Sequence, residues 1–123
     1  MTRDERGSVT IVLVALLGIV LLVAMGLADV TSTIAAATRA QDAADATALG
    51  AAQEMAMPSR RSPTEVATEY AVRNGSSLVA CICDPASFEA VVTVRVPVGR
   101  LLLFDDARTV EASARAVVAL PSS

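Results

Sequence analysis

The chain has 123 residues, of which 54% are hydrophobic and 2% aromatic, and its formal net charge is −3. A nucleic-acid-binding protein would carry a basic patch interleaved with aromatic residues, whereas the ten basic residues here are scattered arginines, so this class is disfavoured. Histidine is absent, which excludes Ser-His-Asp and Cys-His catalytic sites.

The N-terminal 28 residues divide into a charged and an apolar segment. Residues 1–7 include Arg3 and Arg6, whereas residues 8–28 carry no charge and no proline. A helix that crosses a bilayer needs about 20 apolar residues, so residues 8–28 are predicted to form a transmembrane helix. The two arginines favour a cytoplasmic N-terminus. We therefore predict a single-pass protein of the cell membrane, with everything after Asp29 extracytoplasmic.

Three interpretations of the apolar segment remain open. It can be a retained anchor, a signal peptide cleaved after Ala28, or the retained helix of a prepilin-type protein whose leader ends between Gly7 and Ser8. The signal peptide is disfavoured because its apolar region is usually about 7–15 residues long. The segment removed would be residues 1–28 in the second case and residues 1–7 in the third.

The helix is expected to continue outside the membrane through residues 29–57. This segment is rich in alanine, the residue with the highest helix propensity, and it contains no proline. A single helix of about 75 Å is therefore predicted from residue 8 to residue 57. Small or apolar residues recur along it, and we expect these to pack against other helices: Gly18, Ala24, Ala28, Ile34, Ala37, Ala44 and Ala48.

A short amphipathic helix is predicted at the start of the C-terminal domain, residues 58–123. Ser62 and Glu65 have the spacing of a capping box, with a proline at the first helical position between them. The dipeptide Asn74-Gly75 supplies a left-handed stop. The predicted helix is about 11 residues long.

Three strands should follow, at residues 78–83, 87–98 and 108–120. The second and third strands alternate apolar and polar residues, as expected of strands with one buried face. The predicted fold class is α+β: a long N-terminal helix, a short helix and a small three-stranded antiparallel sheet, with one sheet face covered by a helix. This arrangement is pilin-like.

The two cysteines, Cys81 and Cys83, lie two residues apart in the first predicted strand. Their side chains would share a face about 6.5–7 Å apart, which is long for a relaxed disulfide. They are either two small residues at a strand end or a disulfide, within one chain or between chains, in an oxidising compartment.

No reaction centre is recognisable. There is no glycine-rich phosphate loop, and Asp105-Asp106 stands in a predicted loop, where such pairs are usually solvated. The cysteines have no further Cys or His to complete a zinc site. We therefore expect no catalytic residue, cofactor, metal site or small-molecule substrate, and a protein that is not an enzyme.

The first 53 residues resemble the TadE/TadG-like proteins of Flp-type (tight-adherence) pilus assembly systems. Residues 6–10, Arg-Gly-Ser-Val-Thr, lead into the apolar helix as in that family, and residues 26–30, Gly-Leu-Ala-Asp-Val, precede the segment RAQDAADATAL at residues 39–49. The layout is closest to small actinobacterial TadE-like proteins found among secretion genes. The resemblance implies a pseudopilin-like envelope protein whose partners are the membrane, other pilin-like or Tad-type proteins, or further copies of itself.

The resemblance also implies processing by a prepilin peptidase between Gly7 and Ser8. Pilin-type substrates usually carry a glutamate five residues after the cleaved bond, where it pairs with the N-terminal amine of a neighbouring subunit. That position is Val12 here. An accessory or minor component therefore fits better than a major pilin.

Two classes of function remain. The first is a membrane-anchored accessory component of a pilus or secretion apparatus, acting by helix–helix packing and display of its external domain. The second is a secreted or membrane-tethered binding module whose sheet is the recognition surface. Continuation of the small-residue stripe past Asp29 favours the first, because a tether needs no ordered helix beyond the bilayer.

Overall fold

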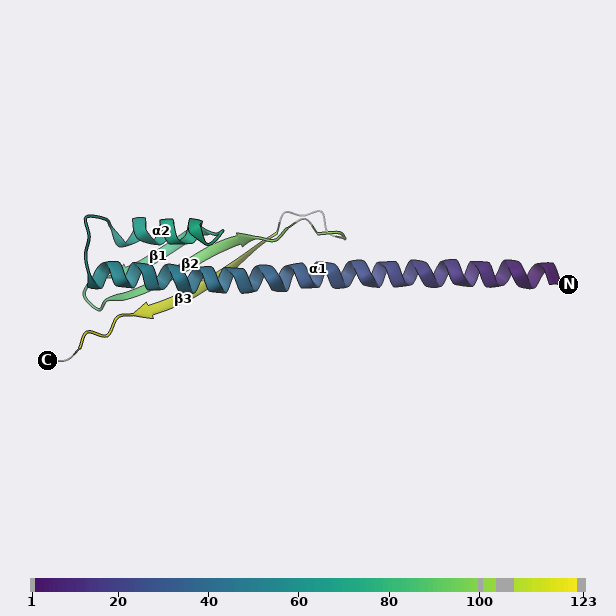
Figure 1. The fold of residues 1–123 in the computed structure, drawn as a ribbon, viewed down its shortest axis with the longest axis horizontal. Helices are drawn as coiled ribbons and strands as arrows, with labels where there is room; N and C mark the ends of the chain where they lie inside the picture. The colour runs from purple at the N-terminus through teal and green to yellow at the C-terminus, as the bar shows by residue number, and fades with distance from the viewer. Residues whose placement is uncertain (1, 100, 104–107, 122–123) are drawn as a thin grey trace.

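The computed structural model describes residues 2–99, 101–103 and 108–121. Two helices precede a three-stranded sheet (Figure 1). In chain order the elements are α1 (Thr2–Ala56), α2 (Pro63–Arg73), β1 (Ser77–Asp84), β2 (Glu89–Pro97) and β3 (Thr109–Val117). The predicted α+β class and the predicted order of elements are confirmed.

Helix α1 is one continuous rod of 55 residues, about 80 Å long. It begins six residues earlier than predicted, because nothing between Thr2 and Gly7 breaks a helix and a single glycine costs only about 1 kcal/mol. Serine and threonine hydroxyls near its middle bond the carbonyl four residues back, as Thr31 does to Leu27 at 2.9 Å and Thr33 to Asp29 at 3.0 Å. The helix nevertheless passes through this β-branched region without a break.

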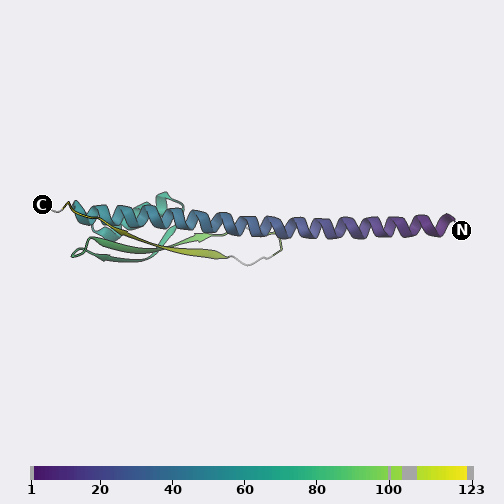
Figure 2. The ribbon, with the colours of Figure 1, turned by 90° about the horizontal axis from the view of Figure 1, so that it is seen from below.

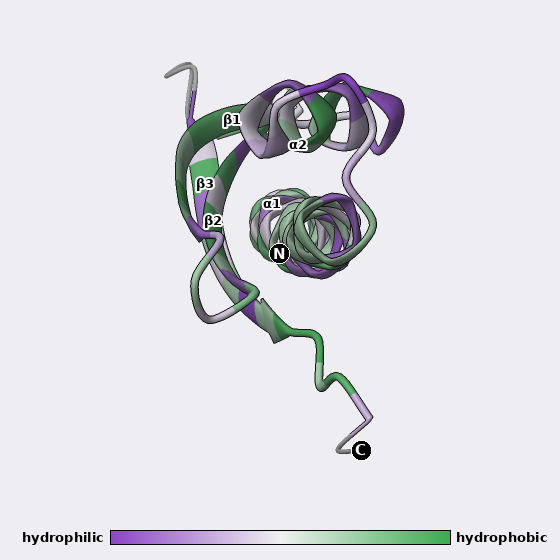
Figure 3. Cartoon of the chain, turned by 90° about the vertical axis from the view of Figure 1, so that its left-hand side faces the viewer, coloured by the Kyte–Doolittle hydropathy of each residue, from purple (hydrophilic) through white to green (hydrophobic). Residues whose placement is uncertain are grey.

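The two halves of α1 have different surroundings. Residues 9–28 are exposed, apart from the half-buried Gly26, and this half extends alone beyond the sheet (Figures 1 and 2). Beyond it, small side chains on one face of the helix are buried by the rest of the chain: Ala36, Ala40, Ala43, Ala44, Ala48, Ala51 and Ala52. Seen along its axis, α1 lies in the concave side of the curved sheet, with α2 beside it (Figure 3).

The sheet is antiparallel with strand order β1-β2-β3. Central strand β2 buries alternate residues, and Val92 and Val94 are among the largest fully buried side chains. In the register, Val92 lies between Cys81 of β1 and Ala114 of β3. The predicted alternation is confirmed, and the core between the sheet and α1 is made mainly of valine and alanine side chains.

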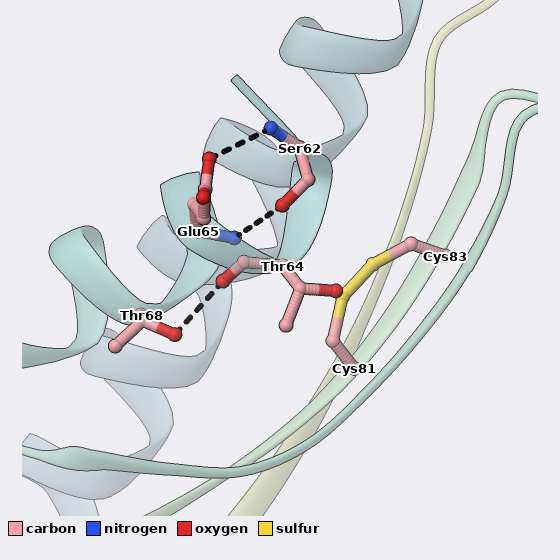
Figure 4. Close-up of a disulfide and its surroundings, with 6 residues drawn as sticks. All are labelled: Ser62, Thr64, Glu65, Thr68, Cys81 and Cys83. Atoms are coloured by element: carbon pink, nitrogen blue, oxygen red, sulfur yellow. Dashed lines mark hydrogen bonds between the residues drawn. A yellow bond between two sulfur atoms is a disulfide. The ribbon is translucent and has the colours of Figure 1, made fainter.

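Helix α2 begins and ends as predicted. The Ser62 hydroxyl accepts the Glu65 N–H at 3.1 Å, while the Ser62 N–H donates to the Glu65 carboxylate at 3.0 Å (Figure 4). Gly75 has φ 72°, in the left-handed region that glycine tolerates best. The cap sets where α2 starts, and α2 then covers the part of α1 near Gly50.

Gly50 is required by the close approach of α2 to α1. A β-carbon on Gly50 would lie 2.9 Å from Cδ2 of Tyr70, the only tyrosine of the chain. This distance is shorter than a van der Waals contact, so a side chain at position 50 would clash with the ring. With glycine there, the aromatic ring packs directly over the helix backbone.

Candidate functional site: the bare half of α1 and the Asp29 clamp

The first candidate surface is the uncovered part of α1. By length and composition α1 is the one helix among the described residues that could cross a membrane. Five of the seven predicted packing residues are exposed within the part of the chain that the structure describes: Gly18, Ala24, Ala28, Ile34 and Ala37.

The remaining two predicted packing residues do not face outward, and this expectation is corrected. Ala44 and Ala48 are 0% and 1% exposed, because they form a core cluster with Val92 and Val94 of the sheet. A stripe of alanines on a helix marks a face against which another element packs. In this chain that element is the sheet of the same chain. These two positions are therefore unavailable to a partner helix.

The second candidate feature is a contact around Asp29 that the sequence did not predict. Asp29 is 5% exposed, and its two carboxylate oxygens accept the backbone N–H groups of Leu102 at 2.7 Å and Leu103 at 2.9 Å. Hydrogen bonds to an ionised acceptor are stronger than neutral ones. We call these three residues the Asp29 clamp: it ties the loop between β2 and β3 to the end of the apolar segment.

The clamped loop has a buried and an exposed part. Leu101 is 7% exposed and packs with Ala36 and Val98, whereas Leu102 and Leu103 are 63% and 46% exposed. In the sequence, Asp29 is the first charged residue after the apolar segment and is part of the family-like motif. Its partners lie more than 70 positions away, and the only signal for them was the run of leucines in a predicted loop.

A polar groove of about 320 Å³ lies between α1 and α2. The Ser59 hydroxyl and N–H donate to the Glu54 carboxylate at 2.5 and 2.7 Å and lower the pKa of Glu54. On the other wall, the hydrogen bond from Arg61 lowers the pKa of Glu69, to which Arg73 also pairs. The charges of the groove thus neutralise one another within the chain.

Cys81 and Cys83 are joined in a disulfide whose Cα atoms are 5.6 Å apart (Figure 4). This separation lies within the usual range for disulfides and is shorter than in a regular strand. The pairing register of β1 shifts between Leu78 and Ala80, just before the bridge. Both cysteines pack against the cluster beneath α2 that contains Ala52 and Ala67.

The other residues singled out in the sequence form no site with their neighbours among the described residues. Gly7 and Ser8, the expected processing position, are exposed residues within α1. Asp105 and Asp106 lie outside the described residues. Within residues 2–99, 101–103 and 108–121, no three or more His, Cys, Asp or Glu side chains cluster so as to hold a metal ion.

These features define an α+β protein with a long, half-bare N-terminal helix of membrane-spanning length. Residues 7–54 match a family model described as Putative Flp pilus-assembly TadE/G-like. The match confirms, for this segment, the resemblance drawn from the sequence. A search of the curated proteins and a search of the solved structures each found no match.

Proposed function

We propose that the protein is a membrane-anchored, pseudopilin-like accessory component of a Tad/Flp-type pilus or related secretion apparatus. The observation that carries this proposal is the division of one unbroken helix into a bare apolar half and a half wrapped by its own sheet. The family match over residues 7–54 supports the same assignment. The role is structural, without catalysis.

In this proposal residues 8–28 span the membrane, with residues 1–7 cytoplasmic and the domain outside. Arg3 and Arg6 support this orientation through the positive-inside tendency. The domain would then be displayed about one helix diameter from the outer surface, since its core begins at Ala36, only seven residues beyond Asp29.

The residues proposed to meet other pilin-like helices are exposed positions of α1: Gly18, Ala24, Ala28, Ile34 and Ala37. Small residues allow helix backbones to approach closely inside a bilayer, where packing and not the hydrophobic effect drives association. Ile34 is 62% exposed and lies one to two turns beyond the proposed span. From Ala40 onward, one face of α1 is covered by the chain's own sheet and α2. Assembly with other helices therefore uses the apolar half of α1 and the turns next to it.

An accessory role fits the residue at position 12. Val12 is an exposed apolar residue, and it stands where a glutamate would pair with the N-terminal amine of a neighbour if cleavage occurs between Gly7 and Ser8. A subunit without that charge contributes to an assembly without forming the repeated ion pairs of a filament core.

The experiment is an intact-mass measurement on protein extracted from native membranes. The proposal expects a membrane-bound product that retains residues 9–28, either full length or lacking residues 1–7. A soluble product that lacks residues 1–28 would contradict it. That result would instead favour the alternative, a secreted binding module whose sheet is the recognition surface.

A further inference from the structure

We propose that Leu102 and Leu103 form a lipid wedge, two side chains that enter the outer interface of the bilayer beside α1 and seat the domain on the membrane. This inference rests on the proposed function in one respect, namely that α1 spans the membrane. Its occupant is lipid, at the boundary between headgroups and acyl chains.

The position of the wedge along α1 carries the argument. The described residues 101–103 of the loop after β2 lie beyond the sheet, toward the N-terminal half of α1 (Figures 1 and 2). A β-carbon placed on Gly26 would lie 3.9 Å from Cδ1 of Leu103. Leu103 therefore reaches the last turn of the apolar segment itself.

Depth in the membrane follows from helix geometry. Residues 9–28 rise about 30 Å, which equals the thickness of the hydrocarbon core. Gly26 is then in the last turn of the span, at its outer boundary. Leu103 lies at the same level, and Leu102, which is 63% exposed, adjoins it. Lipid surrounds an isolated helix at this depth, and apolar side chains are favoured there over water.

The Asp29 clamp removes the usual obstacle to placing a loop at that depth. Backbone N–H groups that enter an apolar phase must be hydrogen-bonded within the protein. The carboxylate of Asp29 accepts the N–H groups of both wedge residues, at 2.7 and 2.9 Å. The same contacts satisfy a carboxylate that lies at the end of the span, and Leu101 holds the loop to the core near Ala36.

The test uses the absence of tryptophan from the chain. The variant Leu103→Trp, as the full chain in phosphatidylcholine–phosphatidylglycerol vesicles, should emit at shorter wavelength than tryptophan in water. Lipids brominated near the carboxyl end of the acyl chain should quench that emission. The matched control Ala86→Trp, in the exposed turn between β1 and β2 at the far end of the domain, should show neither effect. Adding Asp29→Asn to Leu103→Trp should reduce the quenching.

Two results would overturn the wedge. One is water-like, unquenched emission from Leu103→Trp, and the other is a blue shift without quenching, which would mean that protein covers the loop. Leu102→Trp, at the more exposed position, repeats the measurement if the first variant does not fold. Leu16→Trp, within the span, separates the two proposals: quenching there without quenching at the wedge rejects the wedge alone, whereas no quenching at either position rejects the membrane anchor as well.

Discussion

The carboxylate of Asp29 accepts the backbone N–H of Leu102 at 2.7 Å, although the two residues are 73 positions apart in the chain. The contact joins the end of the apolar segment to the loop between the last two strands. It adds a tie between this loop and α1 to the packing of the sheet on the alanine face of the helix.

Asp29→Ala should release this loop. Two part-buried donors lose their acceptor, and the cost lies at the low end of the range of about 1–3 kcal/mol for an unsatisfied buried group. Hydrogen exchange at the Leu102 and Leu103 amides should accelerate strongly, and the domain should lose stability on that scale. Asp42→Ala, an exposed aspartate of the same helix, is the control and should leave both amides protected. Equal exchange in the two variants would show that the carboxylate does not hold the loop.

Gly50→Ala should destabilise the domain by about 1–3 kcal/mol through overpacking against Tyr70. In an unconstrained helix the same substitution would stabilise by about 1 kcal/mol. A loss of stability in Gly50→Ala would therefore indicate the contact with Tyr70. Thermal unfolding in detergent, followed by the near-ultraviolet signal of Tyr70, measures it. Gly18→Ala has no atom within 4 Å of the new β-carbon and serves as the control. In a Tyr70→Ala background the penalty should disappear, and its persistence there would place the strain elsewhere.

Ile34→Arg and Ala44→Arg should act differently. The exposed Ile34 lies on the proposed assembly surface, so arginine there should reduce cross-linking to partner helices in membranes while the domain stays folded. Ala44 is 0% exposed, so arginine at this position should unfold the domain. Ile82→Arg, at a 70% exposed isoleucine of the sheet, is the matched control and should leave cross-linking unchanged. Loss of partner binding in Ile82→Arg alone would favour the sheet as the recognition surface.

Acid should weaken the contact between α2 and the turn that precedes it. The hydrogen bond from Arg61 lowers the pKa of Glu69 in the folded chain, and the bonds from Ser59 lower that of Glu54. A carboxylate with a lowered folded pKa stabilises above its unfolded pKa, and that contribution is lost as the pH falls through the folded value. Melting temperatures between pH 7 and pH 3 should therefore fall less steeply in Glu69→Gln than in the wild type. Because these groups are exposed, salt screens their charges, and the screening length falls to about 3 Å in 1 M salt. The difference in slope between Glu69→Gln and the wild type should therefore shrink in 1 M salt. Parallel pH curves would contradict the assignment.

Local sequence signals predicted the elements well. The capping box at Ser62, the stop at Gly75 and the alternation along β2 each concern residues that interact within a few positions, or that share a face by strand geometry alone. The continuity of α1 followed from the absence of prolines before residue 58. These features need no knowledge of tertiary packing.

Features that depend on tertiary packing were missed or misassigned. The alanine pattern at Ala44 and Ala48 marks a packing face, but it does not identify what packs there, and the chain's own sheet does so. The Asp29 clamp joins residues with no local relation, and the fit of Tyr70 over Gly50 depends on how α2 approaches α1. Each requires the relative placement of elements that sequence periodicity does not specify.

The membrane-spanning arrangement of α1 is tested most directly by labelling single cysteines in intact cells with a membrane-impermeant maleimide. In a Cys81→Ser, Cys83→Ser background, Ala86→Cys reports the domain. Thr2→Cys reports the N-terminus in protein whose intact mass shows that residues 1–7 are retained. Labelling of Ala86→Cys in intact cells, with Thr2→Cys labelled only after permeabilisation, is the predicted result. Protection of Ala86→Cys until the cells are permeabilised would contradict a single span with an extracytoplasmic domain.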